Sequence, residues 1–416
     1  MVLLAYLPEI ATFLLLIMMG TQLPQIGPIL ILCEFALVGL LFVFRTTTFI
    51  DALTRWWWLL LLPIIATLTA LWSDLPMVSV RYGAQFLFTA FVGVLLARLL
   101  PPKRYVLTLH VALFVFCILC ILNGRQGTTF DGMVLIGLTG SKNQMGLASQ
   151  LLMLTAVTVL LMQGVPRLVR WIALASLPLS AYLVLGADSA TALLMSAGGV
   201  VAICGLWFAQ RLPPGGRLGA LIAAAIVIVP LTALLPEATA FVNHFVFDTL
   251  NKDPTLTGRT FLWQSADVLI QRRPLFGYGY QAFWMGNSVD AIAIREVMGI
   301  TDGRQFHFHH QFRQVLVDTG LLGLIPFVGM LLTIAYGHIR QVLLRPTLET
   351  SFFFILFALM VSRAFTDLII NPFNMHTLLF FASGVYAFAK PEPVPAPARQ
   401  TVFGRPLGLQ RPAVQR

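Results

Sequence analysis

Length, composition and charge exclude an ordinary soluble domain. The chain has 416 residues, of which 58% are hydrophobic and only 11% charged, whereas soluble domains carry roughly 25% charged residues. The formal net charge of +10 is also found in nucleic-acid-binding proteins, but the basic residues here are scattered between apolar runs, so we expect no nucleic-acid partner.

Long uncharged runs predict an all-α, polytopic membrane protein, because about 20 apolar residues cross a bilayer as a helix that satisfies its own backbone. We expect about twelve transmembrane helices. The first is retained rather than cleaved as a signal peptide, since residues 1–19 have no basic start and no small-residue cleavage site. The expected spans are 8–22, 28–44, 56–72, 82–99, 105–122, 144–163, 168–186, 190–209, 217–235, 320–338, 350–365 and 374–389.

These spans divide the chain into four parts. Residues 1–235 hold transmembrane helices 1–9, and residues 320–389 hold helices 10–12. Between them, residues 236–319 form a long loop domain, and residues 390–416 form a cytoplasmic tail that we expect to be disordered.

The basic residues predict the orientation. With the amino terminus inside and twelve spans, the short outer loops keep only Arg81, Arg125, Lys142 and Arg363. The cytoplasmic segments hold Arg45, Arg55, Arg98, Lys103, Arg104, Arg167, Arg170, Arg211, Arg217, Arg340, Arg345, Lys390, Arg399, Arg405, Arg411 and Arg416. This asymmetry follows the positive-inside rule and places the long loop outside the cytoplasm.

Two polar segments interrupt the apolar runs. Residues 123–143 form an outer loop rich in Gly, Thr and Asn. Residues 236–319 are the longest polar stretch and hold four of the seven histidines. Thr257-Gly258 at the start of a run with helical spacing, and Arg272-Arg273-Pro274 at its end, predict a helix in this stretch. The long loop is therefore expected to be structured and to lie over the membrane.

The same loop predicts a turn and a second helix. Gly277-Tyr278-Gly279-Tyr280 is typical of a turn. The second helix is expected from about Phe306 and leads into the span that begins near Gly320. It would place His309 and Arg313 one helical turn apart.

Several short motifs follow one another in a specific order. They are Leu71-Trp72-Ser73-Asp74-Leu75-Pro76 with Arg81, Gly140-Ser141-Lys142-Asn143 with Gly146, Asp188-Ser189-Ala190-Thr191-Ala192, Thr257-Gly258-Arg259-Thr260 with Trp263, Pro274-Leu275-Phe276-Gly277-Tyr278-Gly279, His309-His310-Gln311-Phe312, and Asp318-Thr319-Gly320-Leu321-Leu322-Gly323. With these motifs, which cover most of the chain from about residue 70 to 325, the sequence resembles the O-antigen ligase and polysaccharide polymerase superfamily of bacterial envelope glycosyltransferases.

The resemblance implies a GT-C-type membrane glycosyltransferase in the bacterial inner membrane with its active site facing the periplasm. Its donor would be an undecaprenyl-diphosphate-linked oligosaccharide, and its acceptor another glycan or lipid A–core. Membrane lipids and other polysaccharide assembly proteins are the further partners that it implies. Neither a metal nor another cofactor is expected.

Two departures from the family pattern bear on the acceptor. Many ligases have an Arg where this chain has Ala190, and the family often reads His-Asn where this chain reads His309-His310. The first departure weakens the case for a strict ligase. Trp72-Ser73 and Lys142-Asn143 look more like exopolysaccharide polymerases of the succinoglycan type, so polymerase and ligase both stay open.

Two residues are the expected catalytic groups. Displacing a diphosphate from an anomeric carbon requires positive charge where negative charge develops, and a base for the acceptor hydroxyl. Arg259 suits the first task because its planar guanidinium can grip phosphate with two hydrogen bonds and stays charged. His309 suits the second, and Arg313 would keep it neutral by like-charge repulsion.

Further substrate contacts are expected from side chains in the loops and at the outer ends of spans, where charges near hydrocarbon are often functional. These residues are Arg81, Lys142, Asn143, Arg313 and Arg363. Asp367 could border the same cavity. The alternative for Arg81 and Lys142 is that they are snorkelling anchors.

Structural alternatives exist for the catalytic candidates as well. Arg259 could pair with Asp253 or cap a helix, and a loop histidine is often only solvated. His307 and His310 are interpreted as structural. Zinc binding by the three neighbouring histidines is disfavoured, because positions so spaced on one helix do not converge on an ion and no HExxH motif accompanies them.

Two functions of other classes compete with glycosyl transfer. A multispan transporter of a lipid-linked or anionic substrate would need charged or broken helices near the bilayer midplane, and it leaves the long loop without a task. A noncatalytic partner in polysaccharide export is the third possibility, since fold alone does not determine function.

Overall fold

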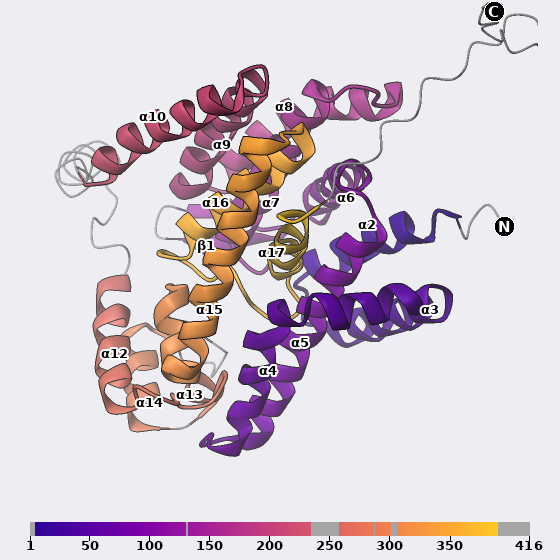
Figure 1. The fold of residues 1–416 in the computed structure, drawn as a ribbon. Coiled ribbons are helices and arrows are strands. Elements are labelled where there is room, and N and C mark those ends of the chain that lie inside the picture. The colour runs from indigo at the N-terminus through magenta and orange to yellow at the C-terminus, as the bar shows by residue number, and fades with distance from the viewer. Residues whose placement is uncertain (1–4, 130–131, 234–257, 287, 301–305, 390–416) are drawn as a thin grey trace, which may run out of the picture.

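The computed structural model describes residues 5–129, 132–233, 258–286, 288–300 and 306–389 (Figure 1). Its helices in chain order are α2 (Leu7–Gly20), α3 (Gly27–Arg55), the 3-10 turn η1 (Trp57–Leu60), α4 (Leu61–Leu68), η2 (Thr69–Leu71), α5 (Pro76–Leu99), α6 (Pro102–Asn123), α7 (Lys142–Leu161), α8 (Arg167–Gly186), α9 (Ala190–Ala209), α10 (Pro214–Ala233), α12 (Arg259–Arg272), α13 (Ala282–Met285), α14 (Val289–Val297), α15 (Gln311–Leu344), α16 (Leu348–Arg363) and α17 (Met375–Tyr386). The tail expected over 390–416 lies outside the described residues.

The all-α polytopic class is confirmed. Each expected span overlaps a helix of the structure. Within the described residues, seven helices are long and apolar enough to cross a membrane, namely α3, α5, α6, α7, α8, Thr191–Ala209 of α9, and α15. The count of about twelve spans stays a prediction, because the apolar helices Leu7–Gly20, Trp57–Leu71 and Met375–Tyr386 are shorter.

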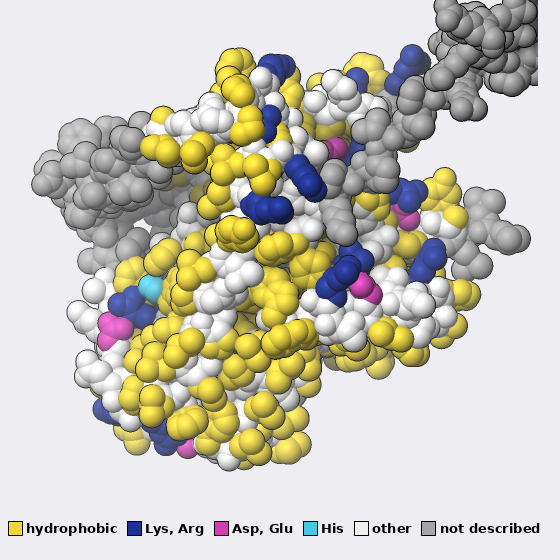
Figure 2. All heavy atoms as spheres, viewed as in Figure 1, with side chains coloured by type: hydrophobic (Ala, Val, Ile, Leu, Met, Phe, Trp, Pro, Cys, Tyr) yellow, Lys and Arg dark blue, Asp and Glu magenta, His cyan; other side chains and the backbone are white. Residues whose placement is uncertain are grey.

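Apolar side chains cover much of the molecular surface, as Figure 2 shows for one face. On α3, Leu32 and Val43 are each 70% exposed, which would be unfavourable in water but suits contact with lipid. Polar side chains within the helices instead join one helix to another. His110 of α6 lies 3.0 Å from the hydroxyl of Thr155 on α7, which is typical of interhelical hydrogen bonds in membranes.

The outer loop at 123–143 contains a short hairpin that was not expected from sequence. Strands β1 (Gln126–Thr129) and β2 (Gly132–Leu135) pair antiparallel. Arg125 closes this loop, since its guanidinium donates to the backbone carbonyls of Gly137, at 2.9 Å, and Thr139. The loop then leads into Ser141, whose side chain caps α7.

Helices α12, α13 and α14 gather beside the first turns of α15 (Figure 1). They enclose a small apolar core of their own, in which Leu262, Trp284 and Phe308 are fully buried. The indole of Trp263 also donates to the carbonyl of Phe308 at 3.1 Å. The predicted helix from Arg259 is confirmed, and Thr257 in its expected cap lies outside the described residues.

Helix α15 does not begin at Phe306 as expected. It begins at Gln311, and His310 is its N-cap, with Nδ1 accepting the backbone N–H of Arg313 at 3.4 Å. His309 precedes the helix with a left-handed φ of 50°. The predicted helical turn between His309 and Arg313 is therefore wrong.

Backbone hydrogen bonds join the Gly277–Gly279 turn to the kink of α15. Gly320 interrupts α15 with a φ of 62°. The backbone N–H of Tyr278 donates to the carbonyl of Val317 at 2.8 Å. That of Gly279 donates to the carbonyl of Asp318 at 3.0 Å. Two of the sequence motifs thus form one backbone junction that joins the loop to the spans.

Replacing Gly320 with alanine should destabilise this junction. A Cβ atom there would lie 2.3 Å from the backbone of Leu275, and the left-handed backbone alone costs a non-glycine residue about 1–3 kcal/mol. We expect a lower melting temperature in detergent and less monodisperse protein by size-exclusion chromatography. Gly329→Ala in the same helix is the control, because a Cβ atom there meets nothing within 4 Å. Equal melting temperatures for the two variants would contradict this account of the junction.

Candidate functional site

A polar cavity of about 360 Å³, within the range of ligand sites, opens where several helix ends meet. It is bounded by the start of α7, the segment before α15, the end of α16 with the turn that follows, and the start of α17. The lining residues are Gly140, Ser141, Asn143, Gln144, Leu147, Phe306, His307, His309, Arg363, Asp367, Leu368, Ile369, Asn371, Asn374 and His376.

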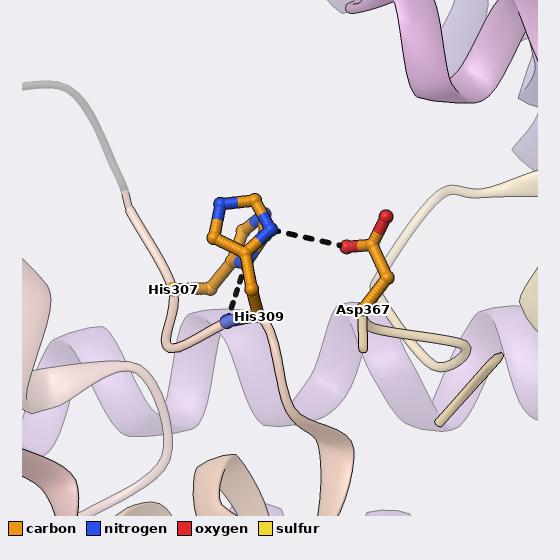
Figure 3. Close-up of side chains that lie close together, drawn as sticks. All are labelled: His307, His309 and Asp367. Carbon is orange, nitrogen blue, oxygen red and sulfur yellow. Dashed lines mark hydrogen bonds and ion pairs between the residues drawn. The ribbon is translucent and has the colours of Figure 1, made fainter. Parts of the chain in front are cut away.

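His309 and Asp367 both line this cavity and face each other (Figure 3). His309 Nδ1 lies 3.5 Å from Asp367 Oδ1, and both side chains are largely buried. The backbone N–H of His309 donates to His307 Nδ1 at 3.2 Å, and the two imidazole rings lie 4.0 Å apart. A carboxylate beside Nδ1 favours the proton on that nitrogen, which leaves Nε2 able to accept a proton from a substrate.

Asp367 remains a carboxylate. Burial alone would raise its pKa, but the neighbouring His309 imidazole and the positive charge of Arg363 outweigh burial and hold the pKa well below its usual range. The side chain is therefore a fixed negative charge that can orient the imidazole and stabilise its protonated form.

Gln311 holds the His309 segment against the turn that carries Asp367. Its backbone N–H donates to the carbonyl of Ala364 at 2.8 Å. Its side-chain oxygen accepts the N–H groups of Ile369 and Ile370, each at 3.0 Å. Because Gln311 is only 3% exposed, these contacts fix the two halves of the site relative to each other.

Arg363 supplies a buried positive charge. It is 4% exposed, and its Nη2 donates to Asp367 Oδ2 at 3.1 Å and to the carbonyl of Asn143 at 3.3 Å. Its Nε and Nη1 atoms have no hydrogen-bond partner among the residues that the structure describes. Buried donors without partners cost about 1–3 kcal/mol each, so an anionic ligand in the cavity would fit them.

Arg259 lies within electrostatic range of the same charges, at the first position of α12. Partial burial lowers its pKa most, Asp367 raises it and Arg363 lowers it. A guanidinium starts from so high a pKa that it stays charged at neutral pH. Asp367 thus pairs with Arg363 and interacts electrostatically with Arg259, which does not line the cavity, and the group has net positive charge.

His307 lies close enough to His309 and Asp367 to form a possible metal-ligand group. The expected single helix through these histidines is wrong, since His307 and His309 precede α15. The candidate ligand atoms of His307, His309 and Asp367 lie within 4.8 Å of one another. Burial, with the charge of His309 next, lowers the pKa of His307 to about 3, so it is a neutral imidazole. The positive charges of Arg259 and Arg363 act against a bound cation here, and metal independence stays a prediction.

The other predicted substrate contacts lie apart from the cavity lining, except for Asn143. Lys142 Nζ lies 3.5 Å from Asp188 Oδ2. Arg81 is exposed on α5, with its guanidinium 5.5 Å from the ring of Tyr82. A substrate role for Lys142 and Arg81 stays a prediction.

Arg313 has a different neighbour from the one expected. Its Nε and Nη2 donate to the carboxylate of Asp267 at 2.8 and 3.1 Å, and its guanidinium lies 5.4 Å from the ring of Trp263. The partner of His309 is Asp367 rather than Arg313. The expected repulsion between His309 and Arg313 is therefore replaced by a contact with a carboxylate.

Three cavity residues near α17 were not predicted from the sequence, namely Asn371, Asn374 and His376. The available signal was an asparagine two positions before a histidine at the start of an expected span, which fits a helix cap. Asp367 was noted only as a residue at the cavity border. Its position four residues after Arg363 at a helix end was the signal for a pair.

Together, fold and cavity define an all-α polytopic membrane protein with a buried arginine, histidine and aspartate site beneath a structured loop. Comparison with known proteins then gives two similarities. Residues 174–328 match the family described as O-antigen ligase. The chain is also 29% identical over 333 residues to the exopolysaccharide production protein ExoQ of Rhizobium meliloti (strain 1021), a match that covers 79% of this chain and 76% of that protein. These matches confirm the resemblance to the O-antigen ligase and polysaccharide polymerase superfamily.

Proposed function

We propose that this chain is a metal-independent glycosyltransferase that moves a glycan from undecaprenyl diphosphate to an acceptor at the periplasmic face of the inner membrane. The observation that carries the proposal is the cavity itself. It combines a histidine oriented by a carboxylate with the unpartnered N–H groups of the buried Arg363. A base and an anion site side by side are what transfer from a diphosphate requires.

The proposed reaction is a single displacement. The acceptor hydroxyl attacks the anomeric carbon of the donor sugar, a new C–O bond forms, and the bond to the diphosphate oxygen breaks. Undecaprenyl diphosphate leaves with the bonding electrons, and Arg259 and Arg363 stabilise its charge. His309 Nε2 accepts the hydroxyl proton while Asp367 holds Nδ1. The product has the inverted anomeric configuration.

The acceptor is either a second lipid-linked glycan or lipid A–core. The name of the Rhizobium relative, an exopolysaccharide production protein, favours a polymerase. Deletion of the gene distinguishes a polymerase from a ligase. Accumulation of short lipid-linked repeat units supports a polymerase, lipid A–core without long glycan supports a ligase, and unchanged glycans contradict both.

The ends of three helices support the periplasmic location. Helices α7 and α17 begin at the cavity, and α16 ends there. At the opposite end of α7, Lys103 and Arg170 donate to the carbonyls of Gln163 and Met162, and Arg345 lies just before the start of α16. The positive-inside rule makes those ends cytoplasmic.

Cysteine labelling should confirm this orientation. In a chain whose four native cysteines are replaced by alanine, Val289→Cys should react with an impermeant maleimide in intact spheroplasts. Gln163→Cys should react only after lysis. Both positions are exposed in the structure, so access depends on the side of the membrane. Reaction of both from one side would contradict the proposed topology.

A further inference from the structure

A second imidazole lines the same cavity, outside all of the family motifs. His376 lies at the start of α17, where Asn374 is the N-cap. The side-chain oxygen of Asn374 accepts the backbone N–H of His376 at 2.9 Å and lies 2.7 Å from His376 Nδ1. Because the backbone N–H identifies this atom as the oxygen, and an amide oxygen only accepts, Nδ1 carries the proton. The other ring nitrogen, Nε2, is therefore a hydrogen-bond acceptor.

That acceptor is unused within the described chain. His376 is 9% exposed, and its Nε2 is buried without a hydrogen-bond partner among the described residues. A neutral Nε2 lone pair repels phosphate oxygens and attracts a hydroxyl or N–H group. The ligand group that fits here is thus a donor, unlike the anion that fits Arg363.

His376 lies among neutral amide side chains and within electrostatic range of Arg363 and Asp367. A small cavity adjoins the main one, and the two share Gln144, Asn374 and His376. The charged pair of Arg363 and Asp367 lines only the main cavity. Neutral amides with one imidazole acceptor suit sugar hydroxyls, whereas the arginines suit a diphosphate.

We propose that His376, held by Asn374, binds a hydroxyl of the acceptor sugar and positions the acceptor for attack. This inference rests on the proposed function and adds a residue to it. His376 is a positioning residue, while His309 takes the proton and Arg259 and Arg363 hold the donor diphosphate. The cavity would therefore offer N–H donors to the donor diphosphate and an acceptor nitrogen to the acceptor sugar.

The test separates acceptor use from donor binding. Purified protein is given lipid-linked repeat units from cells that lack this chain, and the free oligosaccharide, released from lipid by mild acid, is titrated as acceptor. The dissociation constant of undecaprenyl diphosphate is measured in parallel. His376→Phe keeps a ring but removes the acceptor nitrogen, His376→Gln restores an accepting oxygen, and Asn374→Ala frees the imidazole. His338→Phe is the matched control, since His338 is a buried histidine outside the cavity that bonds Ser383.

For His376→Phe and Asn374→Ala we expect half-maximal turnover at roughly 10-fold more oligosaccharide, as for loss of one buried hydrogen bond. The affinity for undecaprenyl diphosphate should stay within about 2-fold, and His376→Gln should recover part of the loss. An unchanged oligosaccharide requirement in both variants, or a parallel loss of diphosphate binding, overturns the inference. Lack of turnover by the wild-type protein overturns the proposed function instead.

Discussion

Exchange of His309 for glutamine is expected to lower glycosyl transfer about 10²- to 10⁴-fold, the usual contribution of a general base. Glutamine keeps the size and polarity of the side chain but cannot accept the acceptor proton. Binding of undecaprenyl diphosphate should persist, because Arg259 and Arg363 hold that group. Turnover of purified protein and the dissociation constant of undecaprenyl diphosphate, measured side by side, check both statements.

His310→Gln is the matched control for that experiment. His310 caps α15 and stacks edge-on against Trp263 at 5.6 Å, and it is absent from the cavity lining. Burial, together with the charge of Arg313, lowers the pKa of His310 to about 4, so this ring is neutral at working pH and glutamine replaces an uncharged group. Near-normal activity in His310→Gln with loss in His309→Gln assigns the base. Full activity in His309→Gln would rule it out.

Arg259→Lys is expected to lower turnover on the order of 10²-fold, comparable with removal of one donor to a developing negative charge. Lysine keeps the charge but presents a single ammonium instead of a planar pair of donors. The amount of protein in the membrane should not change, because Arg259 lies at the first position of α12 rather than in its core. Transfer rates and membrane abundance are measured together.

Arg272→Lys in the same helix is the control for Arg259→Lys. Arg272 pairs with Asp290 at 2.7 Å, and both side chains are about half exposed, so the pair contributes little to stability. This variant should transfer glycan at the wild-type rate. If Arg259→Lys did the same, Arg259 would be an ordinary surface arginine.

Much of the fold could be predicted because lipid imposes its own length and polarity on each span. The apolar runs at 105–122 and 144–163, for example, correspond to α6 and α7. The helix from Arg259 was also predictable from the sequence, since a glycine precedes it and a proline follows its last residues. Such signals are local, so a sequence carries them directly.

The convergence of the site could not be predicted, because it depends on tertiary contacts. The side-chain oxygen of Gln311 accepts the backbone N–H groups of Ile369 and Ile370 and so holds the turn after α16 next to the His309 segment. No local sequence pattern predicts these hydrogen bonds. Helical spacing around His309 suggested Arg313 as its neighbour. Helix α15 begins only after its N-cap at His310, however, so His309 lies outside the helix and faces Asp367.

Transfer of glycan from a lipid diphosphate without a metal is the activity that we propose for this cavity. Its most direct test is purified protein in liposomes with lipid-linked repeat units, with and without EDTA. We predict longer glycan and one undecaprenyl diphosphate released per bond formed, at equal rates in both conditions. Failure to elongate glycan or release diphosphate with either the lipid-linked or the lipid A–core acceptor would contradict the claim, and loss of activity with EDTA would assign His307, His309 and Asp367 to a metal instead.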